Sequence, residues 1–109
     1  MAFKLLDGVT ATGESESVAF TKLVKDHTIQ VIVTGTPSGV TVDLEGSLDD
    51  TTFFQLATHA FSGGEITAQK AMFHVENKVI KNVRLNLTAL SGGTAPTVTA
   101  IYEGFEDRS

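Results

Sequence analysis

The chain has 109 residues, of which 41% are hydrophobic and 19% are charged, a balance typical of a folded globular protein. It contains no cysteine, which excludes a disulfide scaffold, a thiol enzyme and any cysteine-ligated zinc or iron–sulfur site. Its net charge of −5 argues against binding to nucleic-acid phosphates, and no apolar run approaches the ~20 residues that span a bilayer. We therefore expect neither nucleic acid nor a membrane as a partner. The first residues, MAFKLLDG, lack the apolar core of a secretory signal, so we expect synthesis and folding in a cytoplasm.

The distribution of turn-forming and apolar residues along the chain predicts an all-β fold. Ten glycines, two prolines and many threonines separate short apolar runs, whereas helix signals are almost missing. In chain order the predicted strands are residues 2–6, 17–21, 28–34, 40–46, 52–57, 66–69, 72–76, 83–90 and 97–103. Only residues 53–60 also fit a helix. Eight or nine short strands in one domain, residues 1–109, predict a two-sheet β-sandwich of the jelly-roll type. Residues 1–13 are a candidate N-terminal arm and residues 104–109 a candidate C-terminal tail.

Two pairs of strands are the clearest. In residues 28–34 (TIQVIVT) and 40–46 (VTVDLEG), apolar residues alternate with others, and the turn GTPSG lies between them. Residues 83–90 (VRLNLTAL) and 97–103 (TVTAIYE) alternate in the same way on either side of the loop SGGTAP. A short loop that contains glycine and proline between two alternating runs predicts a hairpin, so we predict one for each pair.

Metal-binding patterns are weak. The histidines are His27, His59 and His74, and no two of them have the spacing that places both rings on one strand or helix face. The densest group of carboxylates is Asp43, Glu45, Asp49 and Asp50. Oxygen ligands gathered at a strand end suit calcium, although the D-x-D-x-D-G loop is missing. A solvated outer face gives the same pattern, so the sequence leaves both interpretations open.

Catalytic motifs are missing as well. No serine lies in G-x-S-x-G, and the pairs Gly63–Gly64 and Gly92–Gly93 lack the lysine and the strand–loop–helix context of a phosphate-binding loop. We therefore predict that the protein is not an enzyme, with no catalytic residue, cofactor or metal ion.

Charge is unevenly distributed along the chain. Residues 1–50 carry eight acidic and three basic residues, whereas residues 66–84 carry four basic residues and one acidic residue. If the fold gathers these four basic residues, an acidic surface, including one on a second copy, can dock there. Alternatively, lysines on edge strands discourage aggregation. The basic candidates for an interface are Lys70, Lys78, Lys81 and Arg84.

Residues near the two ends of the chain complete the predicted interface. Phe3, Lys4 and Leu5 belong to the candidate arm, and Phe105 lies in the polar tail GFEDRS, where it looks like an anchor for a neighbour. Phe53 and Phe54 are adjacent, so they point in opposite directions if their segment is a strand, and one of them is free to face a partner.

Two segments resemble small all-β virion proteins of tailed bacteriophages, over residues 27–103. Those proteins have a G-S-x-D segment followed by an aromatic residue and x-x-L, which matches Gly46, Ser47, Asp49, Phe53 or Phe54, and Leu56. They also have a hairpin with V-R, G-G and T-V-T, which matches Val83, Arg84, Gly92, Gly93, Thr97, Val98 and Thr99. The G-S-x-D part resembles discoidin-like jelly rolls too, where it is a structural turn between strands. This chain has Thr-Thr-Phe-Phe where a tryptophan is typical of such segments.

The resemblance implies a structural protein of a phage particle, most plausibly a head decoration (cement) protein on the outer capsid surface. Its expected partners are the major capsid protein or other virion subunits, and it is expected to form a homo-oligomer, for example a trimer. The alternatives are a tail, neck or baseplate adaptor and a β-sandwich module that binds carbohydrate or a host surface.

Overall fold

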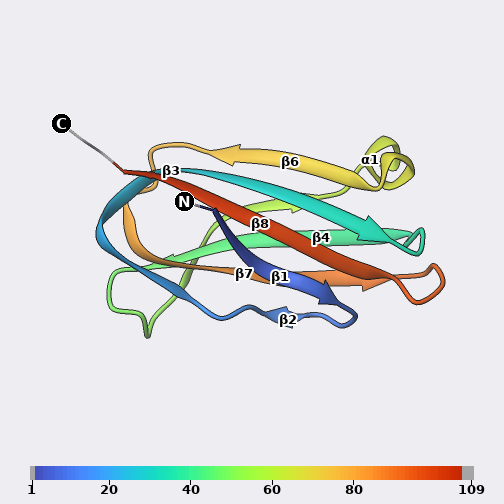
Figure 1. The fold of residues 1–109 in the computed structure, drawn as a ribbon, viewed down its shortest axis with the longest axis horizontal. Coiled ribbons are helices and arrows are strands. Elements are labelled where there is room, and N and C mark those ends of the chain that lie inside the picture. Colours follow the sequence, from blue (N-terminus) through green and yellow to red (C-terminus); the bar gives the residue numbers. More distant parts are fainter. Residues whose placement is uncertain (1, 107–109) are drawn as a thin grey trace.

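The computed structural model describes residues 2–106 and consists mainly of β-strands (Figure 1). In chain order the elements are β1 (Ala2–Val9), β2 (Gly13–Glu14), β3 (Val18–Thr34), β4 (Gly39–Ser47), β5 (Phe54–Ala60), α1 (Gly63–Ala68), β6 (Lys70–Val75), β7 (Ile80–Ser91) and β8 (Thr97–Glu106). The all-β prediction is confirmed, and residues 54–60 form a strand rather than a helix. No helix within residues 2–106 has the length and apolar character that crossing a membrane requires.

The strands form two packed layers. The long strand β3 connects these layers, because its two halves belong to different ones. Residues 18–24 of β3 pair with β7, whereas residues 24–34 pair with β8 on one side, and residues 27–32 pair with β6 on the other. The first layer therefore has the order β6–β3–β8–β1, and it lies nearer the viewer in Figure 1. The second layer contains β5, β4 and β7, with β2 and the start of β3 beside β7. All pairs of strands are antiparallel. The two layers pack face to face and form the predicted β-sandwich.

The core lies between the two layers and follows from the alternation in the sequence. In the first layer, Ile29, Val31 and Val33 of β3 pair with three equally buried residues of β8, whose largest member is Tyr102. In the second layer, the buried residues alternate along β4 and β7 in the same way: Val40, Val42, Leu44, Val83, Leu85 and Leu87. Full burial of a valine, leucine or isoleucine contributes about 1.5–3 kcal/mol, so these rows are the main source of stability.

Both predicted hairpins are wrong. The strands β3 and β4 lie in different layers, as do β7 and β8, because β4 pairs with β5 and β7 whereas β8 pairs with β1 and β3. The glycine-rich loops 35–38 and 92–96 instead cross between the layers and lie side by side. The Thr94 N–H donates to the Gly35 carbonyl (2.9 Å), and the Ser38 N–H donates to the Ser91 carbonyl (2.7 Å). Alternation identifies a half-buried strand but does not identify its neighbour.

The strand predicted for residues 66–69 is also wrong, because residues 63–68 form the helix α1. Ser62 caps this helix. The Ser62 Oγ accepts from the Glu65 N–H (3.2 Å), and the Glu65 carboxylate accepts from the Ser62 N–H (2.9 Å). This reciprocal capping box satisfies two backbone donors and favours a short helix over a strand.

The two ends of the chain belong to the first layer. Residues 2–9 of the candidate arm form β1 and pair with β8, so they are part of the sheet rather than an arm. The strand β8 continues to Glu106, so residues 104–106 of the candidate tail are in the sheet too. Met1 and residues 107–109 lie outside the described residues.

Candidate functional site

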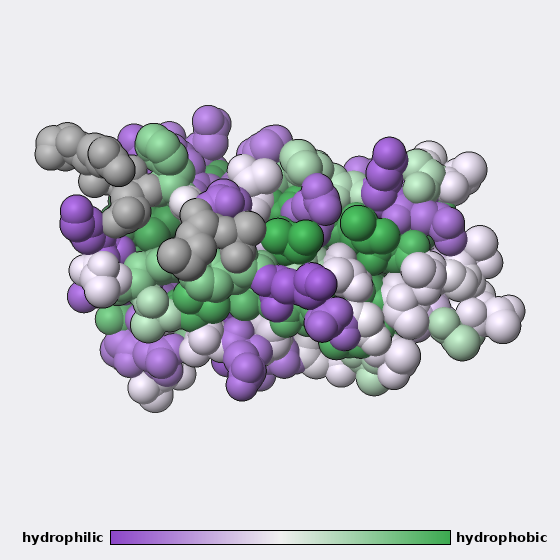
Figure 2. Space-filling model, viewed as in Figure 1, coloured by the Kyte–Doolittle hydropathy of each residue, from purple (hydrophilic) through white to green (hydrophobic). Residues whose placement is uncertain are grey.

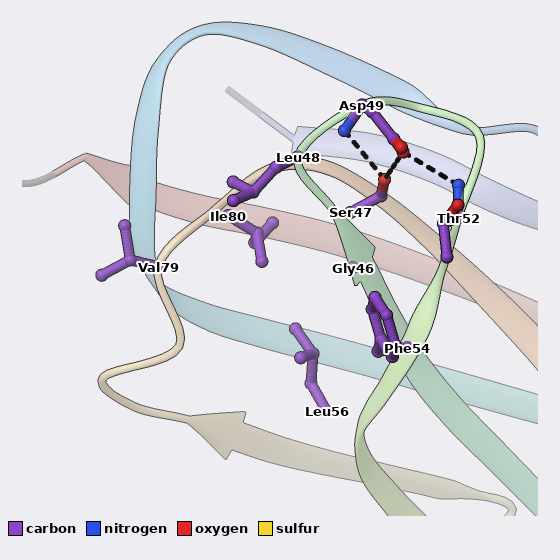
Figure 3. Close-up of a pocket in the computed structure, with 9 residues that line it drawn as sticks. All are labelled: Gly46, Ser47, Leu48, Asp49, Thr52, Phe54, Leu56, Val79 and Ile80. Carbon is purple, nitrogen blue, oxygen red and sulfur yellow. Dashed lines mark hydrogen bonds between the residues drawn. The ribbon is translucent and has the colours of Figure 1, made fainter.

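A hollow of about 350 Å³ opens at the end of the sandwich where the β4–β5 connection meets the start of β7 (Figure 3). Its lining consists of Gly46, Ser47, Leu48, Asp49, Thr52, Phe54, Leu56, Val79 and Ile80. The strand β4 begins at the crossover loops and ends here, so the hollow lies at the opposite end of the molecule from those loops.

Hydrogen bonds around Asp49 hold one wall of the hollow in place. The Asp49 Oδ1 accepts from the Thr51 and Thr52 N–H groups (both 2.9 Å) and from the Ser47 Oγ (2.8 Å). The Ser47 Oγ in turn accepts from the Asp49 N–H at 3.1 Å (Figure 3) and from the Asp50 N–H at 3.0 Å. The bonds from Thr52, Thr51 and Ser47 stabilise the charged carboxylate and lower the pKa of Asp49 to about 2. The G-S-x-D segment is therefore a structural turn, as the resemblance implies.

Gly46 makes room for the apolar floor of the hollow. A Cβ atom at this position would lie 2.7 Å from the Leu56 Cδ1 and 2.9 Å from the Ile80 Cγ2. Any larger residue would displace the Leu56 and Ile80 side chains, so the glycine of the G-S-x-D segment preserves the packing of this floor.

The rim of the hollow exposes three apolar side chains. Leu48 is 67% exposed, Phe54 65% and Val79 47%. A site of this kind favours an apolar group, because the nearby polar atoms of Ser47, Asp49 and Thr52 already bond to one another. Sequence reasoning identified Phe54 as one of two candidates for a partner-facing residue, but it missed Leu48 and Val79. The available signal was a leucine inside the polar turn GSLDD.

Arg84, predicted as part of a basic surface, is instead enclosed by its own sheet. Its Nε donates to the Glu45 Oε1 (2.6 Å), and its NH2 group donates to the Glu14 Oε2 (2.9 Å). Its guanidinium lies 4.1 Å from the centroid of the Phe53 ring, so Phe53 covers Arg84 while Phe54 faces the hollow. The two phenylalanines thus point apart, as predicted. Arg84 ties β2, β4 and the β4–β5 connection to β7.

The three predicted lysines do not form one surface. Lys70 begins β6 beside α1 and pairs with Ile32, whereas Lys78 follows the far end of β6. Lys81 lies near the start of β7, at the same end as Lys78. All three side chains are exposed, but β6 separates Lys70 from the other two.

The residues predicted near the chain ends differ in exposure. Phe3 and Leu5 are half-buried and pack against the core, with the Phe3 ring 6.0 Å from that of Phe20. Lys4 is exposed on β1. Phe105 is 63% exposed near the end of β8.

The acidic group is dispersed as well. Glu45 binds Arg84, Asp49 holds its own turn, and Asp50 accepts from the Ser17 Oγ (2.7 Å). Asp43 is buried, and its Oδ1 has no hydrogen-bond partner among the described residues. Within residues 2–106, no group of three or more His, Cys, Asp or Glu side chains is placed to hold a metal ion.

The histidines lie in three separate settings. His27 is buried against Tyr102, whereas His59 is half-buried and stacks on Phe73 with 5.0 Å between ring centroids. His74 is exposed on β6.

Neither a protein-family model nor a curated protein matches the chain in sequence. Solved structures share its fold. The SPBc2 prophage-derived protein YomS has a TM-score of 0.58 and 10% identity, over 94% of this chain and 90% of that one. The module CBM32-3 from a family 31 glycoside hydrolase of Clostridium perfringens has a TM-score of 0.58 and 11% identity, over 90% and 72%. PirA has a TM-score of 0.54 and 10% identity, over 93% and 91%. Similarity at this level concerns the β-sandwich fold.

Proposed function

We propose that the protein is a structural, non-enzymatic component of a tailed-bacteriophage particle, a head decoration protein that binds the major capsid protein on the outer surface of the shell. The observation that carries the proposal is the similarity in fold to a prophage-derived protein, which extends over 94% of this chain and 90% of that one. In this proposal the protein is made in the cytoplasm of the bacterial host and then attaches to the capsid.

The geometry of the hollow supports a binding role. Its exposed side chains are apolar, and the nearby carboxylate of Asp49 is held as an acceptor of three hydrogen bonds. A carboxylate with so low a pKa is a poor proton donor or base near neutral pH, so it serves the turn rather than acid–base catalysis.

A decoration protein stabilises its shell by mass action. If it binds the expanded, assembled lattice and not the free subunits, every bound copy lowers the free energy of the assembled state. Many copies on one shell add their contributions, so each contact can be weak. A small sandwich with its β-strands tied together by Arg84 and the Asp49 turn is a suitable rigid body for this role.

Co-sedimentation with expanded capsids that lack the protein tests the proposal. We expect saturable binding at a fixed copy number per capsomer, and capsids that already carry the protein should bind none. If capsids do not bind it and native mass spectrometry shows a discrete ring, the decoration role is wrong and a tail, neck or baseplate adaptor replaces it. If there is neither capsid binding nor a ring, the virion proposal is wrong.

Carbohydrate binding is the second candidate. The similarity in fold to CBM32-3 and the exposed Phe54 ring favour it, because sugars stack on aromatic rings. Glycan arrays with and without calcium test this function. Binding that Phe54→Ala abolishes would support it, and the absence of any glycan signal would contradict it.

A further inference from the structure

The two layers of the sandwich have outer faces of different character. On the outer face of the first layer, hydrophobic residues such as Ile32 and Met72 are interspersed with hydrophilic ones (Figure 2). In the second layer, Asp43 and Glu45 of β4 alternate with core residues, so their side chains belong to the outer face. The outer face of the second layer is therefore polar along its central strand.

Strand register extends this polar face across the second layer. Asp43 pairs with Thr58 of β5 on one side and with Asn86 of β7 on the other, and Asn86 pairs in turn with Glu14 of β2. Directly paired residues place their side chains on the same face of a sheet. Thr58, Asp43, Asn86 and Glu14 thus form one polar row across four strands.

Carboxylates outnumber the basic group beside them on this face. Asp43, Glu45 and Glu14 share it with Arg84, so these four residues together carry two more negative than positive charges. Arg84 donates to both glutamates, and the Asn86 amide donates to the Glu45 Oε2 (3.1 Å). The two glutamates therefore have donors from within the chain.

The Asp43 carboxylate, in contrast, is buried without a donor at one of its oxygens. Asp43 is 8% exposed, and its Oδ1 has no hydrogen-bond partner among the described residues. The side chains of the buried His27, Ser47 and Asn82 all have partners. A buried acceptor without a donor lowers the stability of the fold, and such exceptions are typical of functional positions. The free oxygen points to a donor supplied by a bound group.

Neighbouring side chains alone bury Asp43. All eight strands of residues 2–106 belong to the two layers and α1 adjoins β6 of the first layer, so none of these elements lies over the outer face of the second. Thr58, beside Asp43 on the edge strand β5, is exposed. Exposed side chains change rotamer within nanoseconds, so a donor can reach the Oδ1 without a change in the backbone. A shallow hollow of about 380 Å³, lined in part by Glu14, Asn86 and Thr88, gives further room towards β2.

We propose that this face binds an arginine side chain of a partner protein, whose guanidinium donates to the free Oδ1 of Asp43. The excess of carboxylates attracts a cation to the face. A guanidinium suits a buried carboxylate better than an ammonium group does, because it is more weakly hydrated and presents several donors in one plane. The identity of the partner rests on the proposed function, in which it is the major capsid protein, whereas the chemistry of the site does not.

Titration of the ¹⁵N-labelled protein with short capped peptides, followed by NMR, tests the proposal. The probes are GRGRG, GKGKG and GQGQG, which differ only in the charge and shape of two side chains. We expect the arginine peptide to shift the amide signals of Asp43, Thr58 and Asn86, the lysine peptide to shift them less, and the glutamine peptide to leave them unchanged. Added salt should weaken the binding, because it screens the charges of a surface site.

Asp43→Asn removes the charge and keeps the shape of the side chain. It should raise the dissociation constant of the arginine peptide roughly tenfold or more, the effect of losing a hydrogen bond between charged groups. It should also raise the urea midpoint of unfolding, because the buried oxygen no longer carries an unpaired charge. Asp7→Asn is the matched control: it makes the same change of charge at an exposed site on β1 and should leave peptide binding unchanged.

Thr58→Arg is a second, independent test, because it supplies the guanidinium from the chain itself, directly across from Asp43. It should raise the urea midpoint and abolish binding of the arginine peptide. An arginine peptide that shifts none of the three signals, or that binds Asp43→Asn as tightly as the unaltered chain, would overturn the proposal. A lower urea midpoint in Asp43→Asn would do so too, since Asp43 would then serve the fold.

A neutral saccharide gives the remaining comparison. If maltotriose shifts the same three signals and the arginine peptide does not, the face binds carbohydrate and the proposal is wrong. Capsid binding is measured separately. Peptide binding at Asp43 without capsid binding would remove the decoration role and leave this site in place.

Discussion

His27 and Tyr102 form a buried polar pair whose protonation is fixed by its partners. The His27 Nε2 lies 2.8 Å from the Lys78 carbonyl, which only accepts, so this nitrogen carries the proton. The Nδ1 then accepts from the Tyr102 hydroxyl at 2.6 Å. Burial lowers the pKa of His27, although the bond to Lys78 and the charge of Asp26 oppose the shift. Burial also raises the pKa of Tyr102. At neutral pH both side chains are uncharged, and both ring nitrogens of His27 and the Tyr102 hydroxyl have hydrogen-bond partners.

This pair predicts how stability depends on pH. Because the folded pKa of His27 lies below the unfolded value of about 6.5, the unfolded chain binds more protons in this range. The unfolding free energy should therefore fall as the pH decreases from about 6.5 through the folded pKa, and the contribution of His27 should be constant above it. Urea unfolding at a series of pH values measures this loss. His27→Gln should flatten the profile, whereas the control His74→Gln, at an exposed site, should not. An unchanged profile in His27→Gln would contradict the assignment.

Loops 35–38 and 92–96 have the most specific backbone requirements among the connections. Gly93 has φ +71°, and a Cβ atom there would collide with the carbonyl oxygen of Gly35. Gly8 has a similar φ of +61° but would meet nothing within 4 Å. At Gly8, glycine is needed only for its positive φ. At Gly93, it is needed both for its positive φ and for the close approach of the two loops.

Alanine at these two positions should have different effects. Gly8→Ala should lower the unfolding free energy by about 1 kcal/mol, the cost of a left-handed conformation for a residue with a Cβ. Gly93→Ala should cost about 1–3 kcal/mol more because the crossover loops must separate. Chemical denaturation of both variants gives the two values, and equal losses would show that contact between the loops does not contribute.

The elements show which parts of the fold are readable from sequence. Residues 28–34 and 83–90 were predicted as strands and lie inside β3 and β7, because burial of one face imposes a period of two. The pairing of strands was not readable, because GTPSG and SGGTAP have the composition of hairpin turns yet cross between layers. The helix α1 was missed although its capping serine and glutamate were present, since six residues give too little periodicity.

The hollow could be predicted even less well. Its rim combines Leu48, Phe54 and Val79, which come together only because β4, β5 and β7 are neighbours in the folded sheet. The G-S-x-D segment was recognised and is the turn that shapes one wall. Arg84 was predicted as a member of a basic interface, because the sequence does not show that Glu14 and Glu45 lie beside it and pair with it.

At the scale of the whole molecule, the two ends of the sandwich carry different surfaces, and the long strand β3 connects the two layers near one of them. It joins the layers at Val24, next to the end that carries the hollow and the exposed Phe105. The crossover loops and α1 occupy the opposite end (Figure 1). The two ends therefore differ in character, with apolar side chains at one and glycine-rich loops at the other.

Heat-induced disassembly of expanded capsids, followed by calorimetry at increasing concentrations of the added protein, tests the decoration role most directly. If the protein binds and stabilises the assembled shell, the disassembly temperature should rise with its free concentration and continue to rise by mass action after the sites are filled. Unexpanded capsids serve as the control and should respond less. A disassembly temperature that does not change at any concentration would contradict the proposed function.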